Sequence, residues 1–383
     1  MIDRPVLTQD VRLPAEPIDR VVDPIARFLH VESASGVVLL LATVAALALA
    51  NSPASEDFLS LWQTPLGFSV GALEMHHSLK HWINDGLMVI FFFVVSLEVK
   101  RELILGELRE LRVAALPIAA ALGGMVAPAA LYLAFQWGEA AQHGWGIPMA
   151  TDIAFVVGCM ALLGPRVPNS LRILLLSLAI ADDVGAILVI AIGYTTELSL
   201  SALAWAFLGI GLVMLLQRMG VRNLGIYVPL GVGIWFGFHE SGVHATIAGV
   251  VLGLLTGVRP WVSQKLLTQF VHQLGGFLQG NSWHDTHQRQ ALLHSVETAV
   301  RKSISPMERL EAALHPWVSF VIMPLFAFAN AGVPIAAGAF TDSVAMAIVV
   351  GLCVGKPVGI VLFSWFAVRT GLAKLPEGVS WGI

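Results

Sequence analysis

The chain has 383 residues, of which 56% are hydrophobic and only 13% charged, with a formal net charge of −4. Soluble proteins carry about 25% charged residues, and the mean hydropathy here is +0.77. This composition excludes a soluble globular protein and predicts an all-α protein that crosses a membrane many times. Residues 1–30 are polar and lack the apolar run of a signal peptide, so we expect a cytoplasmic N-terminal arm.

Residues 31–375 are predicted to form one transmembrane domain. A membrane-spanning helix needs about 20 apolar residues, and ten runs in the sequence approach or exceed that length. The predicted spans cover residues 36–50, 84–104, 114–135, 146–164, 172–193, 200–217, 224–238, 242–258, 313–331 and 343–368.

Basic residues between these spans predict the orientation, because cytoplasmic loops are enriched in Lys and Arg. The arm and every loop after an even-numbered span are basic, whereas the loops after odd-numbered spans carry only Lys80. The alternation favours ten spans with a cytoplasmic N-terminus.

Residues 64–76 alternate apolar residues with small or polar ones around Val70 and Gly71. This pattern predicts a small β-hairpin on the extracytoplasmic side, with a plain surface loop as the alternative. A two-stranded hairpin is marginally stable alone, so it is expected to pair with a second copy.

Residues 259–312 form a long segment with few apolar runs, which we expect to be a cytoplasmic loop. Its histidines favour a solvated loop over a metal site, because no ligand spacing repeats among them. They are His272, His284, His287 and His294.

Ionisable residues deep in predicted spans are the main candidates for function, because they are costly there. Asp182 and Asp183 are adjacent, and the run from Ile173 to Tyr194 holds no other charge. Asp182 follows Arg172 by ten residues, or about 15 Å along a helix, which is half the hydrocarbon core. The other two are Asp152 and Lys356, in the fourth and tenth spans.

Three acids and one lysine cannot all pair, so a purely structural ion pair leaves a carboxylate unexplained. A buried carboxylate resists ionisation, the more so beside a second one. Once ionised, it offers hard oxygen ligands that suit Na⁺ or Li⁺. Protons and cation then compete for one site, which predicts their exchange across the membrane. Two protons exchanged for one cation would move net charge, so the membrane potential would drive the cycle.

Helix breakers surround two of these residues. Gly146 and Pro148 precede Thr151 and Asp152, and Lys356 lies directly between a glycine and a proline. Interrupted spans free backbone carbonyls and helix ends to coordinate ions, which is consistent with an ion site.

Three other functions compete with cation–proton exchange. A sodium-coupled solute symporter would need more polar residues at the membrane midplane. An intramembrane aspartyl protease would need a G-x-G-D loop, and a non-transporting scaffold is favoured only by the short C-terminus. The sequence therefore predicts no enzyme, no cofactor and no nucleic-acid partner.

From Arg27 onward, the chain carries a series of motifs that resembles the NhaA family of bacterial sodium–proton antiporters. The resemblance implies an NhaA-type fold with discontinuous helices and inverted repeats, located in the bacterial inner membrane. It also implies a homodimer through residues 64–76 and a role in sodium and pH homeostasis. The motifs are W-I-N-D-G-L-M, F-F-F-V-V-S-L-E-V-K-R-E-L, A-T-D-I-A-F, L-A-I-A-D-D-V-G-A-I, S-G-V-H-A-T-I-A-G-V, L-H-P-W-V, P-L-F-A-F-A-N-A-G-V, G-K-P-V-G-I and L-P-E-G.

The same resemblance implies roles for single residues. Asp182 and Asp183 would bind Na⁺ and carry protons, with Thr151 nearby. Lys356 would pair with Asp182 when no cation is bound, and Asp152 and Lys356 would offset the charges of interrupted helix ends.

Activation at alkaline pH through a cytoplasmic cluster is a further implication. Glu308 and Ala312 stand where the family has a basic residue and a histidine. His244 is an additional candidate, for which interfacial hydrogen bonding is the alternative. The matching members are Glu98, Arg101, Glu102, Glu311 and His315.

The family has twelve spans, and this sequence ends after the tenth, with residues 376–383 as a truncated C-terminus. We therefore expect a fragment of a normal antiporter. The alternative is an inactive truncated antiporter.

Overall fold

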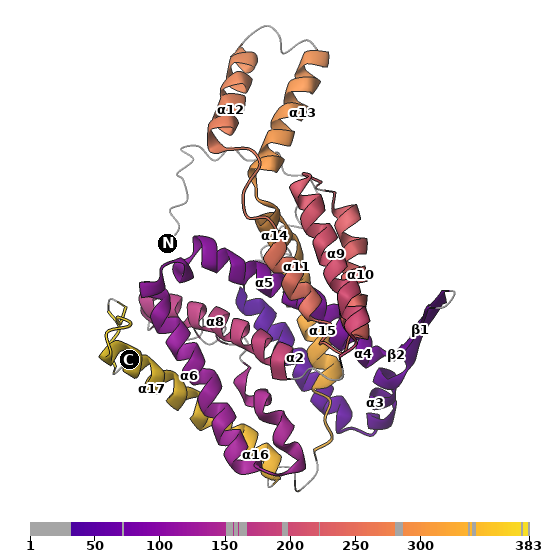
Figure 1. Cartoon of the computed structure of the whole chain (residues 1–383), viewed down its shortest axis with the longest axis vertical. Helices are drawn as coiled ribbons and strands as arrows, with labels where there is room; N and C mark the ends of the chain where they lie inside the picture. Colours follow the sequence, from indigo (N-terminus) through magenta and orange to yellow (C-terminus); the bar gives the residue numbers. More distant parts are fainter. Residues whose placement is uncertain are drawn as a thin grey trace.

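The computed structural model is a helical bundle from which a β-hairpin and a pair of helices project (Figure 1). The N-terminal arm, Thr151 and Asp152 lie outside the residues that the structure describes. Those residues are 32–70, 73–150, 156, 160, 167–193, 198–221, 223–279, 286–335, 338, 342–376 and 378–381.

The described chain begins with helix α2 (Glu32–Ala50), which is followed by α3 (Ser55–Gln63) after a bend of 114°. Strands β1 (Pro65–Val70) and β2 (Leu73–Ser78) then pair antiparallel, with Pro65 opposite Ser78, where the sequence predicts a hairpin. The two strands extend away from the bundle in Figure 1.

A continuous run of helix leads from the hairpin into the bundle. The short α4 (Leu79–His81) continues into a π-helical turn, η1 (Trp82–Leu87), and then into α5 (Met88–Leu105). A 3₁₀ turn, η2 (Glu107–Arg109), separates α5 from α6 (Leu111–Gln136).

The last helical run packs along α6. It consists of α16 (Ser343–Val350), the π-helical η8 (Gly351–Gly355) and α17 (Lys356–Arg369). Helices α6 and α17 approach so closely at Gly123 and Gly359 that a Cβ atom on either glycine would lie 2.1 Å from the carbonyl oxygen of the other. Only glycine fits this contact, so it fixes the height of Lys356 against α6.

Helices α9, α10 and α11 pack through a shared apolar cluster that includes Ala206, Ile234 and Phe238. The span predicted at 242–258 is shorter than expected. Residues 241–246 form a turn, in which Gly242 has a φ of 79°. The three helices are α9 (Leu200–Arg218), α10 (Leu224–Glu240) and α11 (Ile247–Leu255).

The segment 259–312, predicted as a loop, contains two helices that project from one end of the bundle (Figure 1). They are α12 (Gln264–Gln279) and α13 (Thr286–Ser303). After them, α14 (Pro306–Trp317) continues through the π-helical η6 (Val318–Ile322) into α15 (Met323–Asn330).

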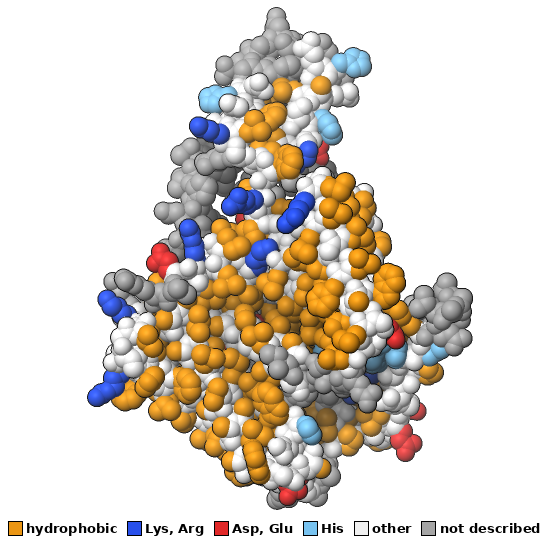
Figure 2. Space-filling model, viewed as in Figure 1, with side chains coloured by type: hydrophobic (Ala, Val, Ile, Leu, Met, Phe, Trp, Pro, Cys, Tyr) orange, Lys and Arg blue, Asp and Glu red, His pale blue; other side chains and the backbone are white. Residues whose placement is uncertain are grey.

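Large apolar side chains cover much of the outer surface of the bundle (Figure 2). Trp205 of α9 is 71% exposed and Phe366 of α17 is 60% exposed, which is costly in water but suits contact with lipid. Within the described residues, five helices are long and apolar enough to cross a membrane, or six if the bent α2–α3 pair is one span. The chain is therefore a multi-pass membrane protein.

Candidate functional site

Helix α8 (Asn169–Gly193) carries the two adjacent aspartates. Asp182 is buried, with 4% of its surface exposed, and its Oδ2 accepts a hydrogen bond of 2.8 Å from Nζ of Lys356. The two residues are 174 positions apart in the chain. The ion pair thus compensates the charge of each buried partner.

Lys356 joins three elements. It is the first residue of α17, directly after the π-helical turn η8, and its Nζ also donates to the carbonyl oxygen of Met149. Met149 ends the 3₁₀ helix η3 (Ala140–Met149), at the start of the fourth predicted span. The lysine therefore lies between the C-terminal end of η3 and the Asp182 carboxylate, where its charge acts on both.

Asp183 faces a different environment, because adjacent residues on a helix point about 100° apart. Asp183 lines a cavity of about 1200 Å³ between α5, α8 and the α14–η6–α15 run, and it is half-buried. Ser177 and Ile180 of the same helix face this cavity too. One aspartate is thus held by a lysine, while its neighbour adjoins a space large enough for water and ions.

The acidic and basic residues expected to respond to pH line the same cavity. Arg101 of α5 forms an ion pair with Glu311 of α14, and Nε2 of His315 lies 4.0 Å from Oε1 of Glu98. Arg101 and Glu311 are 210 positions apart in the sequence. All five expected members line the cavity: Glu98, Arg101, Glu102, Glu311 and His315.

Glu308 has a structural role of its own. It forms a capping box with Ser305 at the start of α14, in which the Ser305 hydroxyl accepts from the Glu308 amide at 3.1 Å and the carboxylate accepts from the Ser305 amide at 2.9 Å. Such caps stabilise a helix by about 1 kcal/mol. The acidic residue at this position is therefore explained by helix capping.

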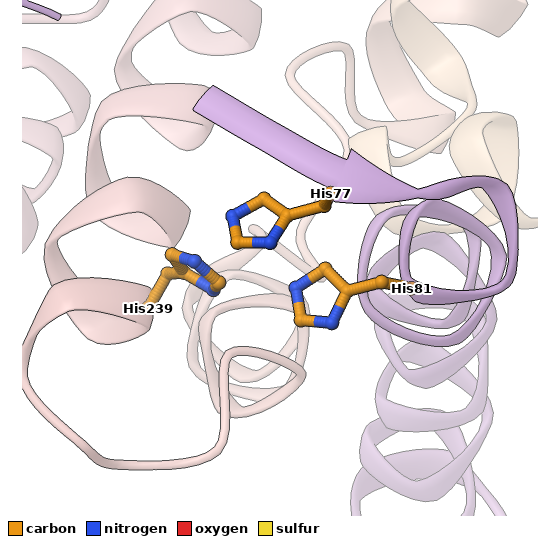
Figure 3. A group of neighbouring side chains, drawn as sticks. All are labelled: His77, His81 and His239. Atoms are coloured by element: carbon orange, nitrogen blue, oxygen red, sulfur yellow. The ribbon is translucent and has the colours of Figure 1, made fainter. Parts of the chain in front are cut away.

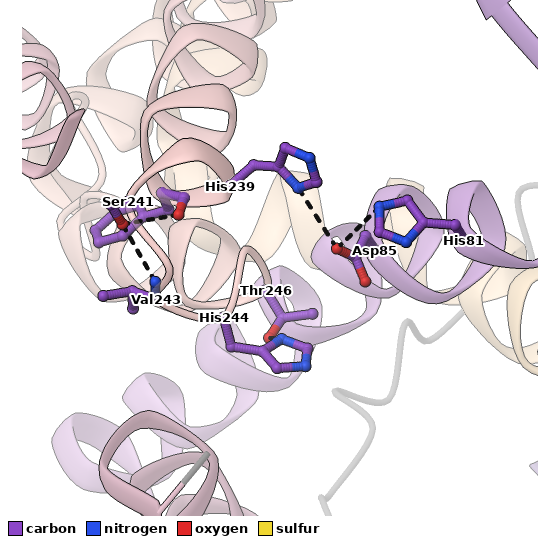
Figure 4. Close-up of polar contacts among 8 residues, drawn as sticks. His81, Asp85, His239, Ser241, Val243, His244 and Thr246 are labelled. Atoms are coloured by element: carbon purple, nitrogen blue, oxygen red, sulfur yellow. Dashed lines mark hydrogen bonds and ion pairs between the residues drawn. The ribbon is translucent and has the colours of Figure 1, made fainter. Parts of the chain in front are cut away.

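His244 is not part of that cluster. It lies in the turn between α10 and α11, where its Nδ1 is 2.9 Å from Oγ1 of Thr246 (Figure 4). Its neighbours in Figure 4 are Asp85 and His239, near the base of the hairpin. The contact with Thr246 matches the hydrogen-bonding alternative.

His77, His81 and His239 form a cluster that the sequence pattern does not predict. Burial, followed by the neighbouring charges of His81 and His239, lowers the pKa of His77 below the usual value of 6.5. The spacing His77-x₃-His81 is a signal that the sequence contained, whereas the third histidine is 158 positions further along. No reasoning on local spacing would have found that third member.

The apolar helical bundle contains a buried carboxylate–lysine pair and a cavity with ionisable residues in its wall. Such groups between membrane helices mark ion and proton pathways, so they define the class as a membrane protein that transports ions. Comparison with known proteins identifies the family within this class. The model of the family described as Na⁺/H⁺ antiporter 1 matches residues 26–383, and the chain belongs to this family.

Several relatives are similar over nearly the whole chain. The Na(+)/H(+) antiporter NhaA of Rhodopirellula baltica is 54% identical over 97% of this chain and 84% of the relative. The NhaA of Rhizobium meliloti is 51% identical over 97% of this chain and 85% of the relative. The NhaA 2 of Acidiphilium cryptum is 49% identical, with coverage of 98% and 83%.

Proposed function

We propose that this protein exchanges Na⁺ or Li⁺ from the cytoplasm for external protons and thereby serves sodium and pH homeostasis. The observation that carries the proposal is the unequal placement of two adjacent carboxylates. Asp182 is paired with Lys356, whereas Asp183 lines the cavity. Membership of the antiporter family supports the same reaction.

The proposed cycle begins with a cation entering the cavity and meeting Asp183. Its charge attracts the Asp182 carboxylate as well, so the cation competes with Lys356 for the same oxygen atoms. When the cation leaves, Asp182 and Asp183 each take up a proton, and Lys356 returns to Asp182 once both protons have been released on the other side. Cation and proton thus occupy the site in turn, and neither crosses without the other.

Thr151 and Asp152 belong to the same proposal, although they lie outside the described residues. Thr151 would add an oxygen ligand to the cation. Asp152 and Lys356, which carry opposite charges, would offset the opposite partial charges at the ends of interrupted helices. The proposed exchange is electrogenic, with more than one proton per cation, so the membrane potential drives it.

We assign pH regulation to the ionisable residues of the cavity wall. Glu98, Glu311 and His315 share the cavity with Asp183. A change in their protonation alters the electrostatic potential that a cation meets on its way to the site. This arrangement supports a response to pH in which the cavity attracts cations only once its acids are ionised.

The orientation follows the distribution of basic residues, with the N-terminus and the α12–α13 helices in the cytoplasm and the hairpin outside. We infer location in the bacterial inner membrane, about ten spans with inverted repeats, and a homodimer whose contact is the hairpin. The free edges of β1 and β2 support such a contact, because unpaired strand edges readily pair with a second chain.

The test measures the collapse of a pH gradient when Na⁺ or Li⁺ is added to acidified everted membrane vesicles. Vesicles with the unaltered chain are expected to lose the gradient, and vesicles with Asp183→Asn are expected to keep it. Asp57→Asn, an exposed aspartate of α3, serves as the control and should exchange normally. Equal activity of the unaltered chain and Asp183→Asn would refute the proposal.

A further inference from the structure

Three histidines meet at the base of the hairpin (Figure 3). His77 lies near the end of β2, His81 ends α4, and His239 is in the last turn of α10. One ring nitrogen from each lies within 4.8 Å of the other two. In the described part of the chain, no other three His, Cys, Asp or Glu residues bring their ligand atoms this close together.

We propose that His77, His81 and His239 form a binding site for a transition-metal ion, with Zn²⁺ as the preferred occupant. This site is separate from the one at Asp182 and Asp183, where the transported cation is proposed to bind. Imidazole nitrogen suits borderline metals such as Zn²⁺, whereas Na⁺ prefers oxygen ligands. The spacing His77-x₃-His81 is one that zinc sites use.

Side-chain movement alone can bring the three ring nitrogens to the separations of a tetrahedral zinc site. Zn–N bonds of about 2.0–2.1 Å in a tetrahedron place the ligand nitrogens about 3.3 Å apart. The present separations of up to 4.8 Å must therefore shorten by about 1.5 Å or less, which ring rotation can supply. The ring of His239 crosses that of His77 at 83° and that of His81 at 74°. The rings of His77 and His81 are stacked at 23°, so one of these two must rotate for all three to bind one ion.

Asp85 supplies a fourth possible ligand atom, a carboxylate oxygen. Its Oδ2 lies 3.6 Å from Nε2 of His81 and 3.7 Å from Nδ1 of His239 (Figure 4). These separations exceed a normal hydrogen bond but suit two ligands of one metal ion. The carboxylate would either bind the metal directly or orient the two rings, as carboxylates do beside metal-bound histidines.

One further observation favours metal binding over plain packing. Nε2 of His81 is buried, and no hydrogen-bond partner for it occurs among the described residues. Trp235 stacks on His239, with 5.6 Å between the ring centroids.

The site would join the hairpin to the bundle. His77 and His81 belong to the base of the hairpin, whereas His239 belongs to α10, more than 150 residues later. On the proposed orientation the site faces outside the cytoplasm, where external zinc reaches it. A bound ion would hold the hairpin in one position relative to α10.

The test uses the full chain, purified with an affinity tag that contains no histidine. Zn²⁺ is titrated by calorimetry at about pH 7.5, where ordinary imidazoles are neutral. We expect one ion per chain, with binding weakened about tenfold or more in His81→Gln and in His239→Gln. His76→Gln is the matched control, because His76 is the exposed neighbour of His77 on the opposite face of β2.

X-ray absorption at the zinc edge of the unaltered protein is the second measurement, and it does not depend on any variant folding. Nitrogen-rich coordination at about 2.0–2.1 Å with three histidines is expected. Equal zinc affinity in His76→Gln, His81→Gln and the unaltered chain would overturn the proposal, as would six-fold oxygen coordination. Neither result depends on transport, so failure here is distinguishable from failure of the exchange mechanism.

Discussion

Nζ of Lys356 lies 2.8 Å from Oδ2 of Asp182, and only 13% and 5% of these side chains are exposed. Removing one partner of a buried ion pair leaves an uncompensated charge and costs about 3–5 kcal/mol. We expect Lys356→Met alone, and to a similar extent Asp182→Asn alone, to lower the unfolding temperature of the purified protein. The double variant should recover most of the loss, because neither charge remains.

Thermal unfolding in detergent measures this cycle, and Asp183→Asn is its control. Asp183 lines the cavity, so neutralising it is expected to cost less stability than neutralising Asp182. Losses that simply add in the double variant would contradict the coupling between Asp182 and Lys356.

The contact between α6 and α17 gives a prediction that involves no charge. A Cβ atom at Gly359 would lie 2.1 Å from the carbonyl oxygen of Gly123. Gly359→Ala must therefore push the helices apart, and we expect a loss of about 1–3 kcal/mol. Gly211→Ala in α9 is the control, since a Cβ atom there meets nothing within 4 Å. The control should be neutral or stabilising by about 0.5–1 kcal/mol, and an equal loss in both variants would refute the steric argument.

Much of the helical framework follows from the sequence, because apolar runs between polar segments fix where a helix can lie in a membrane. The run around Asp182 and Asp183 predicts a single long helix, and α8 extends over Asn169–Gly193. The separation of about 100° between adjacent helical residues also predicts that the two aspartates face different surroundings. Both arguments use only local geometry.

Contacts between distant segments were not available from residue patterns. The pairing of Lys356 with Asp182 came from the family resemblance, because charge alone does not say which acid a lysine meets. The meeting of His239 with His77 and His81 was missed altogether. Helix boundaries differ from the predicted ones where a capping motif begins the helix. The Ser305–Glu308 capping box starts α14 several residues before the apolar run predicted from residue 313.

The side chain of Lys100 links α5 to the end of α11. Its Nζ donates to the carbonyl oxygens of Leu254 and Thr256, at 2.6 and 2.5 Å, where α11 ends. These carbonyls have no partner within the helix, so Lys100→Met removes their donor as well as a favourable charge at the helix end. We expect a loss of about 1–3 kcal/mol, measured by thermal unfolding. Lys265→Met, on the exposed α12, should leave stability unchanged, and a comparable loss there would argue against the capping role.

Acidification should release zinc from the histidine cluster. Zinc binds neutral imidazole, so each ligand histidine must lose its proton before it binds. The pKa of His77 lies below the usual 6.5, which means that this residue stays neutral as the pH falls to about 6.5 and gains a proton only below it. The Asp85 carboxylate beside His239 raises the pKa of that residue, so His239 gains its proton at a higher pH than His77 does. Zinc affinity is therefore expected to fall first as His239 is protonated, and more steeply below about pH 6.5, where His77 is protonated as well.

Calorimetric titrations over this pH range, in a buffer that does not bind zinc, provide the measurement. His77→Gln removes one titrating ligand, so its weaker binding should also depend less steeply on pH than that of the unaltered chain. The His76→Gln control should reproduce the pH dependence of the unaltered chain, because His76 lies on the other face of the strand. A pH dependence that is identical in the unaltered chain and in His77→Gln would show that His77 does not bind the metal.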